Sequence, residues 1–167
     1  MASAREVVIT GMGVVSPIGT GRDAFWSSLM AGRSGVVHTT RFDGGAGATC
    51  PVAGEVRDYD AKQHVKPRKN IKVMGRDIQL AVGAADMAAK DARLDTNPVN
   101  PDRLGVSFGA DLIPCELEEM VDAYRGCIVD GKFDFKRWGD EALPDLFPLW
   151  MLKYLPNMPA CHIAISH

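Results

Sequence analysis

The sequence predicts an α/β fold, because short apolar segments typical of buried strands are separated by segments with helical periodicity. Residues 6–10 and 104–108 are short, mainly apolar and closed by a glycine, as expected of strands covered on both faces of a parallel sheet. Between them, residues 22–31 and 74–94 carry apolar side chains at helical spacing. The order strand, helix, helix, strand indicates α/β layering.

Length and charge narrow the class of protein. The 167 residues suit one domain, taken here as residues 1–167. The net charge of −2 gives no overall basic field for nucleic acid. No apolar run approaches the ~20 residues of a membrane span, and residues 1–5 are too short and polar for a signal peptide. We therefore expect a cytoplasmic protein that binds neither membrane nor nucleic acid.

The four cysteines, Cys50, Cys115, Cys127 and Cys161, are widely separated and form no C-x-x-C pair. This spacing disfavours both a metal site and a disulfide framework. We expect reduced, buried thiols that pack as small hydrophobic groups, with Cys115 and Cys127 lining a core or a pocket.

In the first half of the chain, Pro17 excludes a helix until about Gly21, and the helix over residues 22–31 ends at Gly32. Residues 39–48 are glycine-rich and polar, which predicts a loop, and residues 51–56 predict an edge strand. The expected apolar face of the first helix consists of Ala24, Phe25, Leu29 and Met30.

The strongest helical signal covers residues 74–94. Its alanines imply close packing against other elements. The basic stretch over residues 62–72 precedes it, and Pro67 should break any helix there. The apolar stripe of the long helix consists of Ile78, Ala81, Val82, Ala85, Ala88, Ala89 and Ala92.

In the second half, Asn–Pro pairs at 97–98 and 100–101 predict a turn. Residues 116–129 predict a helix. From residue 133 onward the chain is rich in Pro and Trp, with short helices at best around residues 149–155, and its apolar pattern stops at the last residues without a cap or a polar tail. The predicted face of the helix over 116–129 consists of Leu117, Met120, Val121, Tyr124 and Ile128.

Two interpretations are open for Gly11 and Gly13, which follow the first predicted strand. A dinucleotide-binding turn would need a third glycine and a helix that begins at the pyrophosphate, but Ser16 and Pro17 stand there. No strand ends in an acidic residue about 20 residues later, since Asp43 lies in the glycine-rich loop. A positive φ at a sharp turn explains the glycines without a ligand, and this interpretation is preferred.

Several short blocks stand in a characteristic order along almost the whole chain. They are VVITGMGVVSPIG at 7–19, FWSSL at 25–29, GRSG at 32–35, RFD at 41–43, the helix from IQL at 78–92, RLGV through glycine at 103–109, and PNMPA at 156–160. Each block alone is a weak signal. Taken together and in this order, they resemble the amino-terminal part of β-ketoacyl-(acyl-carrier-protein) synthases.

The resemblance implies a thiolase-like fold, in which two similar α/β halves form five alternating αβαβα layers. This chain would supply most of the first half. In the family, a nucleophilic Cys, two His and a Lys perform the reaction, and the resemblance places all four after His167. We therefore expect no catalytic residue and no condensing activity in this chain alone. No metal or bound cofactor is implied, since phosphopantetheine arrives on the carrier protein.

The histidines and the last cysteine are interpreted as structural. Cys161 and His162 are neighbours and point in different directions, so they make a poor nucleophile and base pair, and we expect them to be packing residues. His38 and His64 fall in predicted loops without partners, which favours surface roles.

Two features of the chain could still serve the implied function. The basic cluster matches a region that related ketosynthases use to dock the acidic carrier protein, with a solvated surface as the alternative. Leu117 roughly matches a position that gates the acyl pocket, although residues 111–116 depart from the family's glycine-rich run, and a core residue is the alternative. The basic cluster consists of Lys62, Lys66, Arg68, Lys69 and Lys72.

The leading hypothesis is part of a 3-oxoacyl-(acyl-carrier-protein) synthase, which condenses an acyl thioester with malonyl-carrier protein, with loss of carbon dioxide, in fatty-acid or polyketide synthesis. Its expected partners are an acyl carrier protein and a second subunit, in a homodimer or heterodimer. One alternative is a non-catalytic homologue that acts as a partner subunit, which the residue at the nucleophile position would reveal. A nucleotide-binding module is a second, disfavoured alternative.

Overall fold

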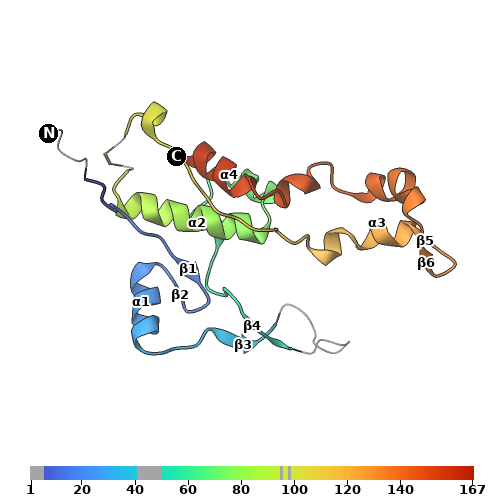
Figure 1. Cartoon of the computed structure of the whole chain (residues 1–167), viewed down its shortest axis with the longest axis horizontal. Coiled ribbons are helices and arrows are strands. Elements are labelled where there is room, and N and C mark those ends of the chain that lie inside the picture. The colour runs from blue at the N-terminus through green and yellow to red at the C-terminus, as the bar shows by residue number, and fades with distance from the viewer. Residues whose placement is uncertain (1–5, 41–49, 95, 98) are drawn as a thin grey trace. The chain divides into compact units, whose positions relative to one another are not determined.

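The computed structural model of the chain describes residues 6–40, 50–94, 96–97 and 99–167. The chain forms two compact units: Met1–Val65 with Leu80–Gly105, and Lys66–Gln79 with Val106–His167. The boundary between them crosses the longest helix, α2 (Arg76–Asp91), shown in green in Figure 1. Among the described residues, no helix combines the length and the apolar character that a membrane span requires.

The first unit contains two small antiparallel strand pairs. The strand pairs and the helix between them in sequence are β1 (Val15–Ser16) with β2 (Gly19–Thr20), α1 (Arg22–Met30), and β3 (Val36–His38) with β4 (Val52–Gly54). The edge strand predicted over residues 51–56 is confirmed as β4, although its partner β3 was not predicted. The RFD block, with Asp43, and most of the loop predicted over residues 39–48 lie outside the described residues.

The first helix has the predicted position but a different buried face. Gly32 follows it with a φ of +63°, the left-handed conformation that commonly ends a helix. Leu29 is 49% exposed, whereas Ser28 is buried, so the predicted apolar face is wrong. A polar contact joins the helix to α2: the Arg22 guanidinium donates to both carboxylate oxygens of Asp91 at 2.9 Å.

The glycines after the first predicted strand pack directly against α2. A Cβ added at Gly13 would overlap the carbonyl oxygen of Ala84, and one at Gly11 would overlap the carbonyl oxygen of Ala88 and lie 2.5 Å from the Ala92 nitrogen. Neither glycine has a positive φ, so the turn that we expected to explain them is wrong. They are glycines because the chain passes too close to the helix for a side chain. The close packing predicted from the alanines is confirmed.

The predictions for the long helix and the basic stretch before it are also confirmed. Helix α2 lies within the predicted residues 74–94 and buries Ile78 and Val82 almost completely. The basic stretch contains only two 3₁₀ turns, η1 (Ala61–Gln63) and η2 (Arg68–Val73), on either side of Pro67.

The two predicted buried strands are wrong for the described residues. Val7, Val8 and Ile9 are 95%, 73% and 85% exposed and form no strand. Residues 104–108 also form no strand, and Phe108 is 40% exposed. A strand is stable when a neighbouring strand pairs with its backbone N–H and C=O groups, and no described segment pairs with either run.

The second unit has its core around α3 (Val121–Gly126). Met120, Ala123 and Cys127 from this helix and its ends pack with Ala142 and Leu146, and all five side chains are at most 9% exposed. The remaining elements are η4 (Leu117–Glu119), the hairpin of β5 (Ile128–Val129) and β6 (Lys132–Phe133), η5 (Phe135–Arg137), the π-helical turn η6 (Trp138–Ala142), η7 (Leu143–Asp145) and η8 (Trp150–Lys153). In the first unit, the second Asn–Pro pair forms the start of η3 (Pro101–Arg103), with Asn100 as its cap, whereas Pro98 lies outside the described residues.

The single helix predicted over residues 116–129 is wrong. The chain divides there into η4, α3 and β5, and the predicted face is largely exposed: Leu117 by 77%, Tyr124 by 47% and Ile128 by 51%. The signal that was missed is Asp130 with Gly131, whose φ values of +50° and +74° suit the two-residue turn of a β-hairpin. This turn ends the helix early and sends the chain back along β6.

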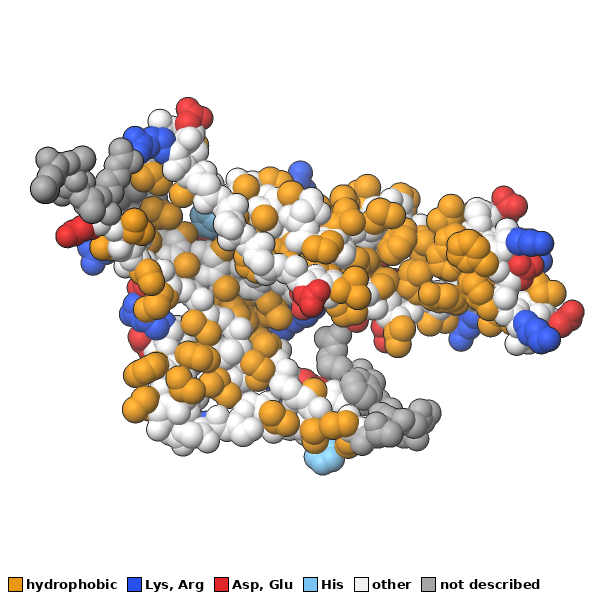
Figure 2. All heavy atoms as spheres, in the orientation of Figure 1, with side chains coloured by type: hydrophobic (Ala, Val, Ile, Leu, Met, Phe, Trp, Pro, Cys, Tyr) orange, Lys and Arg blue, Asp and Glu red, His pale blue; other side chains and the backbone are white. Residues whose placement is uncertain are grey.

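Aromatic rings gather over the outside of α3 and the β5–β6 hairpin. The centroid of the Tyr124 ring lies 5.6 Å from that of Phe133 and 5.5 Å from that of Trp138. These spacings are typical of favourable ring pairs. Tyr124 and Phe133 nevertheless remain almost half exposed, and Figure 2 shows hydrophobic side chains gathered over this part of the second unit.

The end of the chain is more ordered than the sequence suggested. The short helix predicted around residues 149–155 is confirmed as η8. Residues Met158–Ser166 form a helix, α4, that the sequence did not predict.

The contact between the glycines and α2 is testable by substitution. Gly13→Ala would place a Cβ against helix backbone that cannot move independently, so we expect a loss of about 1–3 kcal/mol in the free energy of unfolding. Urea unfolding of the variant and the unmodified chain measures the difference.

The matched control is Gly105→Ala in the same unit, where an added Cβ has no atom within 4 Å. Equal unfolding free energies for the two variants would contradict the close approach described above.

Candidate functional site

All five cations predicted to form a docking surface are exposed, but they belong to different units. Lys62 lies on η1 in the first unit, whereas Lys66, Arg68, Lys69 and Lys72 lie on or just before η2 in the second. We call the latter four the η2 cations. Within the described residues, none of the five side chains forms an ion pair.

Several other cations of the chain, by contrast, pair with carboxylates. The Arg22 guanidinium lies 2.9 Å from Asp91, and Lys153 Nζ lies 2.6 Å from Glu119 Oε1. The η2 cations therefore provide local positive charge on a chain whose net charge is negative. Such a patch attracts an acidic partner even though the protein as a whole does not.

Neighbouring backbone fixes the position of η2. Its first turn is closed by Asn70 N–H donating to the Pro67 carbonyl at 3.0 Å. At its other end, the Gln79 side-chain amide donates to the Met74 carbonyl at 3.0 Å, and an added Cβ on Gly75 would lie 2.6 Å from the carbonyl oxygen of residue 153 in η8. The η2 cations are thus attached to a well-packed support.

We expected His64 to lie on the surface without partners, and this prediction is wrong. Its Nδ1 lies 2.7 Å from Asp86 Oδ2 on α2, and its ring stacks on Tyr59 with centroids 5.5 Å apart. Its side chain is 15% exposed. His38 does lie on the surface, but on β3 rather than in a loop.

Asp86 is shared by two donors. Lys90 Nζ lies 2.6 Å from the same Oδ2 atom that contacts His64. Burial acts to raise the pKa of Asp86, but the hydrogen bonds from Lys90 and His64 outweigh it, and the pKa lies below its usual value. The carboxylate is therefore ionised at neutral pH and can hold both partners.

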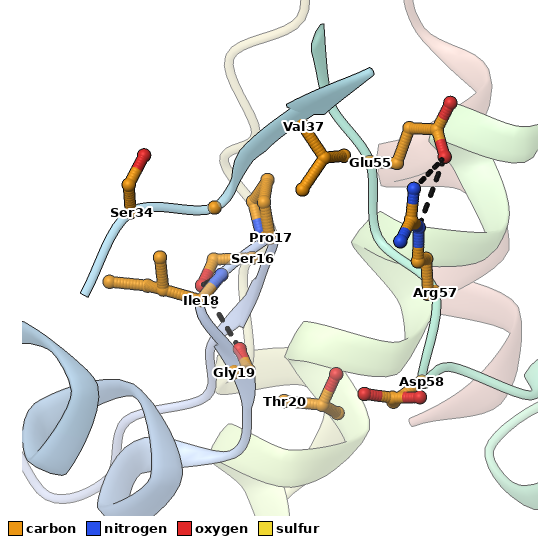
Figure 3. A pocket seen from close by; sticks show the side chains of 11 residues that line it. Ser16, Pro17, Ile18, Gly19, Thr20, Ser34, Val37, Glu55, Arg57 and Asp58 are labelled. Atoms are coloured by element: carbon orange, nitrogen blue, oxygen red, sulfur yellow. Dashed lines mark hydrogen bonds and ion pairs between the residues drawn. The ribbon is translucent and has the colours of Figure 1, made fainter. Parts of the chain in front are cut away.

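A cavity of about 210 Å³ lies between the β1–β2 turn, the chain before β3 and residues 55–58 (Figure 3). It is smaller than the ~300–1,000 Å³ of ordinary small-molecule sites. Polar groups on its wall bond to each other: Ser16 Oγ donates to the Gly19 carbonyl at 3.0 Å, and Arg57 donates to Glu55 at 3.2 Å. These observations favour a structural cavity over a ligand site.

Glu55, on the edge of this cavity, ties the end of β4 to the chain after β3. Thr39 Oγ1 and Thr40 N–H both donate to Glu55 Oε1 at 2.6 Å, and Thr40 Oγ1 donates to Oε2 at 2.9 Å. These hydrogen bonds, that of Thr39 first, lower the pKa of Glu55 to about 2.

The cysteines differ in their surroundings, and all four are free thiols. Cys127 is fully buried, as predicted, whereas Cys50 is exposed, which corrects the expectation of burial for that residue. Burial raises the pKa of the Cys115 thiol, the opposite of the lowered pKa of an activated nucleophile. Among the described residues, no three His, Cys, Asp or Glu side chains gather as a metal site.

The neighbours Cys161 and His162 lie on α4. His162 is 6% exposed, and burial lowers the pKa of its imidazole, which supports the packing role predicted for it. Cys161 is partly buried, and the Asn157 side-chain amide lies 3.7 Å from its sulfur. Leu117 stands at the exposed start of η4, so the core alternative is wrong for it, and its role at the acyl pocket stays a prediction.

The dinucleotide interpretation of the glycine turn fails on geometry. Gly11 and Gly13 lie against helix backbone, and their approach leaves no room for a pyrophosphate. The next helix, α1, begins only at Arg22, six positions beyond Ser16.

Solved structures with a similar fold are ketosynthases. An ishigamide ketosynthase/chain length factor matches with a TM-score of 0.62 and 27% identity, over 95% of this chain and 36% of that chain. A β-ketoacyl synthase from Burkholderia phymatum STM815 matches with a TM-score of 0.67 and 23% identity over the same shares. A third, at 17% identity and a TM-score of 0.56, is a type II polyketide ketosynthase in complex with its acyl carrier protein. The fold is therefore that of the amino-terminal part of thiolase-like condensing enzymes.

The chain belongs to the β-ketoacyl synthase family. The family described as "Beta-ketoacyl synthase, N-terminal domain" matches residues 4–167, nearly the whole chain. This confirms both the resemblance and the fold expected from it.

Curated relatives carry the name 3-oxoacyl-(acyl-carrier-protein) synthase 2. The protein from Synechocystis sp. is 43% identical over 105 residues, and that from Coxiella burnetii is 42% identical over 106 residues. The matches cover 63% and 64% of this chain. The chain spans about a quarter of the length of these relatives, since each match covers 25% of the relative.

The hydrogen bonds to Glu55 predict a defined pH dependence of stability. Because the folded-state pKa is depressed to about 2 from an ordinary value of 4.5, the carboxylate stabilises the fold above about pH 4.5. That contribution is lost as the pH falls from about 4.5 to about 2. We expect Glu55→Gln to lose less stability than the unmodified chain over this range in urea unfolding.

Thr39→Val removes the hydrogen bond with the largest effect on this pKa, so the folded-state pKa of Glu55 should rise. The loss of stability on acidification should then be complete at a higher pH than in the unmodified chain. Parallel pH profiles for the unmodified chain and Glu55→Gln would contradict the role of Glu55.

Proposed function

We propose that this chain forms the amino-terminal part of a 3-oxoacyl-(acyl-carrier-protein) synthase of fatty-acid or polyketide synthesis. The observation that carries the proposal is the family match over residues 4–167, together with relatives that bear this name. The complete enzyme would be cytoplasmic and would act as a homodimer or heterodimer.

The proposed reaction has two steps at a cysteine that the resemblance places after His167. The thiolate takes an acyl group from a carrier thioester and releases the carrier as a thiolate, which then takes up a proton. Malonyl-carrier then loses carbon dioxide, and the resulting carbanion attacks the acyl-cysteine carbonyl, which forms the carbon–carbon bond and releases the thiolate. On this proposal, the 167-residue chain alone has no condensing activity.

The contribution proposed for this chain is to dock the carrier. Carrier proteins of this kind are acidic, and the η2 cations with Lys62 are exposed and form no ion pair within the described residues. The phosphopantetheine arm comes with the carrier, so the chain needs no resident cofactor. A protein of the same fold in complex with its acyl carrier protein supports this proposal.

Charge reversal in the complete synthase tests the docking proposal. Lys69→Glu combined with Lys72→Glu replaces attraction by repulsion at an exposed rim, so we expect the KM for the acyl carrier substrate to rise about 3- to 10-fold. The effect should shrink at high salt, because exposed charges are screened. Steady-state kinetics with a purified acyl carrier gives the measurement.

The matched control is Lys132→Glu with Lys136→Glu, the same reversal at two exposed lysines of the second unit. An unchanged KM in the Lys69 and Lys72 variant, or an equal rise of the KM in the control, would contradict the docking proposal.

A further inference from the structure

Four side chains of the first unit form a connected group outside the cavity, and we call it the His64 clamp: Tyr59, His64, Asp86 and Lys90. His64 Nδ1 lies 2.7 Å from Asp86 Oδ2, and Lys90 Nζ lies 2.6 Å from the same oxygen. Tyr59 stacks on the His64 ring with an angle of 6° between the planes. The clamp joins residues 59–64, which contain η1, to α2.

The contacts of this clamp lie on both sides of η1. A 3₁₀ turn of three residues has little stability of its own, so the contacts around it must fix it. Tyr59 lies directly on α2, because a Cβ added at Gly83 would overlap its ring, and Val65 at the other end of the segment is completely buried. His64 supplies the polar attachment between these two apolar ones.

The polar attachment does not require a charged histidine. Asp86 is ionised and paired with Lys90, so neutral His64 with its proton on Nδ1 can donate to the carboxylate. The bond is directional and only 15% of the His64 side chain is exposed, which fixes the ring and the backbone that carries it.

The exposed side of the clamped segment carries Lys62. Asp60 caps η1 by accepting a hydrogen bond from the Lys62 N–H at 3.0 Å, so the backbone at Lys62 is held in place. Along the sequence, the first of the η2 cations, Lys66, follows the buried Val65 directly.

We propose that His64 is a positioning residue for carrier docking: its bond to Asp86 fixes η1, so that Lys62 meets the acidic carrier in a set geometry. This inference rests on the proposed docking function. It assigns the specificity of the carrier site in part to a residue that does not touch the carrier.

Two substitutions in the complete synthase separate the parts of the clamp. His64→Phe keeps a ring against Tyr59 but removes the donor to Asp86, whereas His64→Asn keeps a donor near the Nδ1 position but removes the ring. We expect His64→Phe to raise the KM for the acyl carrier about threefold or more, without changing kcat or the KM for a carrier-free pantetheine thioester. His64→Asn should restore the KM to within about twofold of the unmodified enzyme.

Asp86→Asn provides a second variant if His64→Phe does not fold, and it should raise the same KM because it weakens the acceptor. The proposal is overturned if the variant that folds leaves the KM for the carrier unchanged. It is also overturned if kcat and the KM for the small thioester change in step with it, as for a general loss of structure.

Lys62→Glu distinguishes failure of the clamp from failure of docking. If Lys62→Glu and the η2 reversal both raise the KM and His64→Phe does not, docking stands and the clamp proposal falls. If only the η2 reversal raises it, docking also stands without Lys62, and the clamp proposal again falls. If neither reversal has an effect, the docking function itself is wrong.

Discussion

The first unit depends on a contact between two stretches of backbone, the glycines at positions 11 and 13 and the alanine face of α2. No side chain fits between them, so the helix lies at a fixed, short distance from the chain that precedes β1. Two carboxylates of α2 then hold neighbouring segments by hydrogen bonds. Asp91 accepts from Arg22 of α1 and from the Met12 N–H, and Asp86 accepts from His64. One close approach thus organises a strand pair, a helix and a loop.

The helices α1 and α2 were predictable because their signal is local. The spacing of apolar residues and the glycine at 32 or the proline at 67 place α1, α2 and the break before η2 correctly. Apart from the edge strand β4, strands were not predictable, because a strand exists only through its partner. The run at Val7 to Ile9 has the unbroken apolar composition of a strand covered on both faces, and the described residues cover neither. After α3, the two-residue hairpin turn at Asp130 and Gly131 overrides helical periodicity.

The candidate site also has parts that local sequence patterns reveal and parts that they do not. The basic residues could be found from the sequence, since five cations within eleven positions, with a proline among them, predict an exposed segment. The clamp could not, because His64 and Asp86 are 22 positions apart and neither stands out in its own segment. The same holds for Glu55, whose threonine partners lie across the β3–β4 pair. Local sequence patterns do not reveal hydrogen-bond partners that are distant in the sequence.

In the basic segment, the exposed cations depend on buried contacts beneath them. Exposed ion pairs are worth only about 0–1 kcal/mol each, so the proposed docking surface would have to work through several charges, each held in a defined position. Lysine side chains are flexible, and the arrangement must come from the backbone beneath them. Both turns that carry the cations are too short to hold their own shape. Their support is the interior: Tyr59 and Val65 beneath η1, and the closely packed backbone at Gly75 after η2. The surface chemistry of this chain is therefore a consequence of how its helices pack.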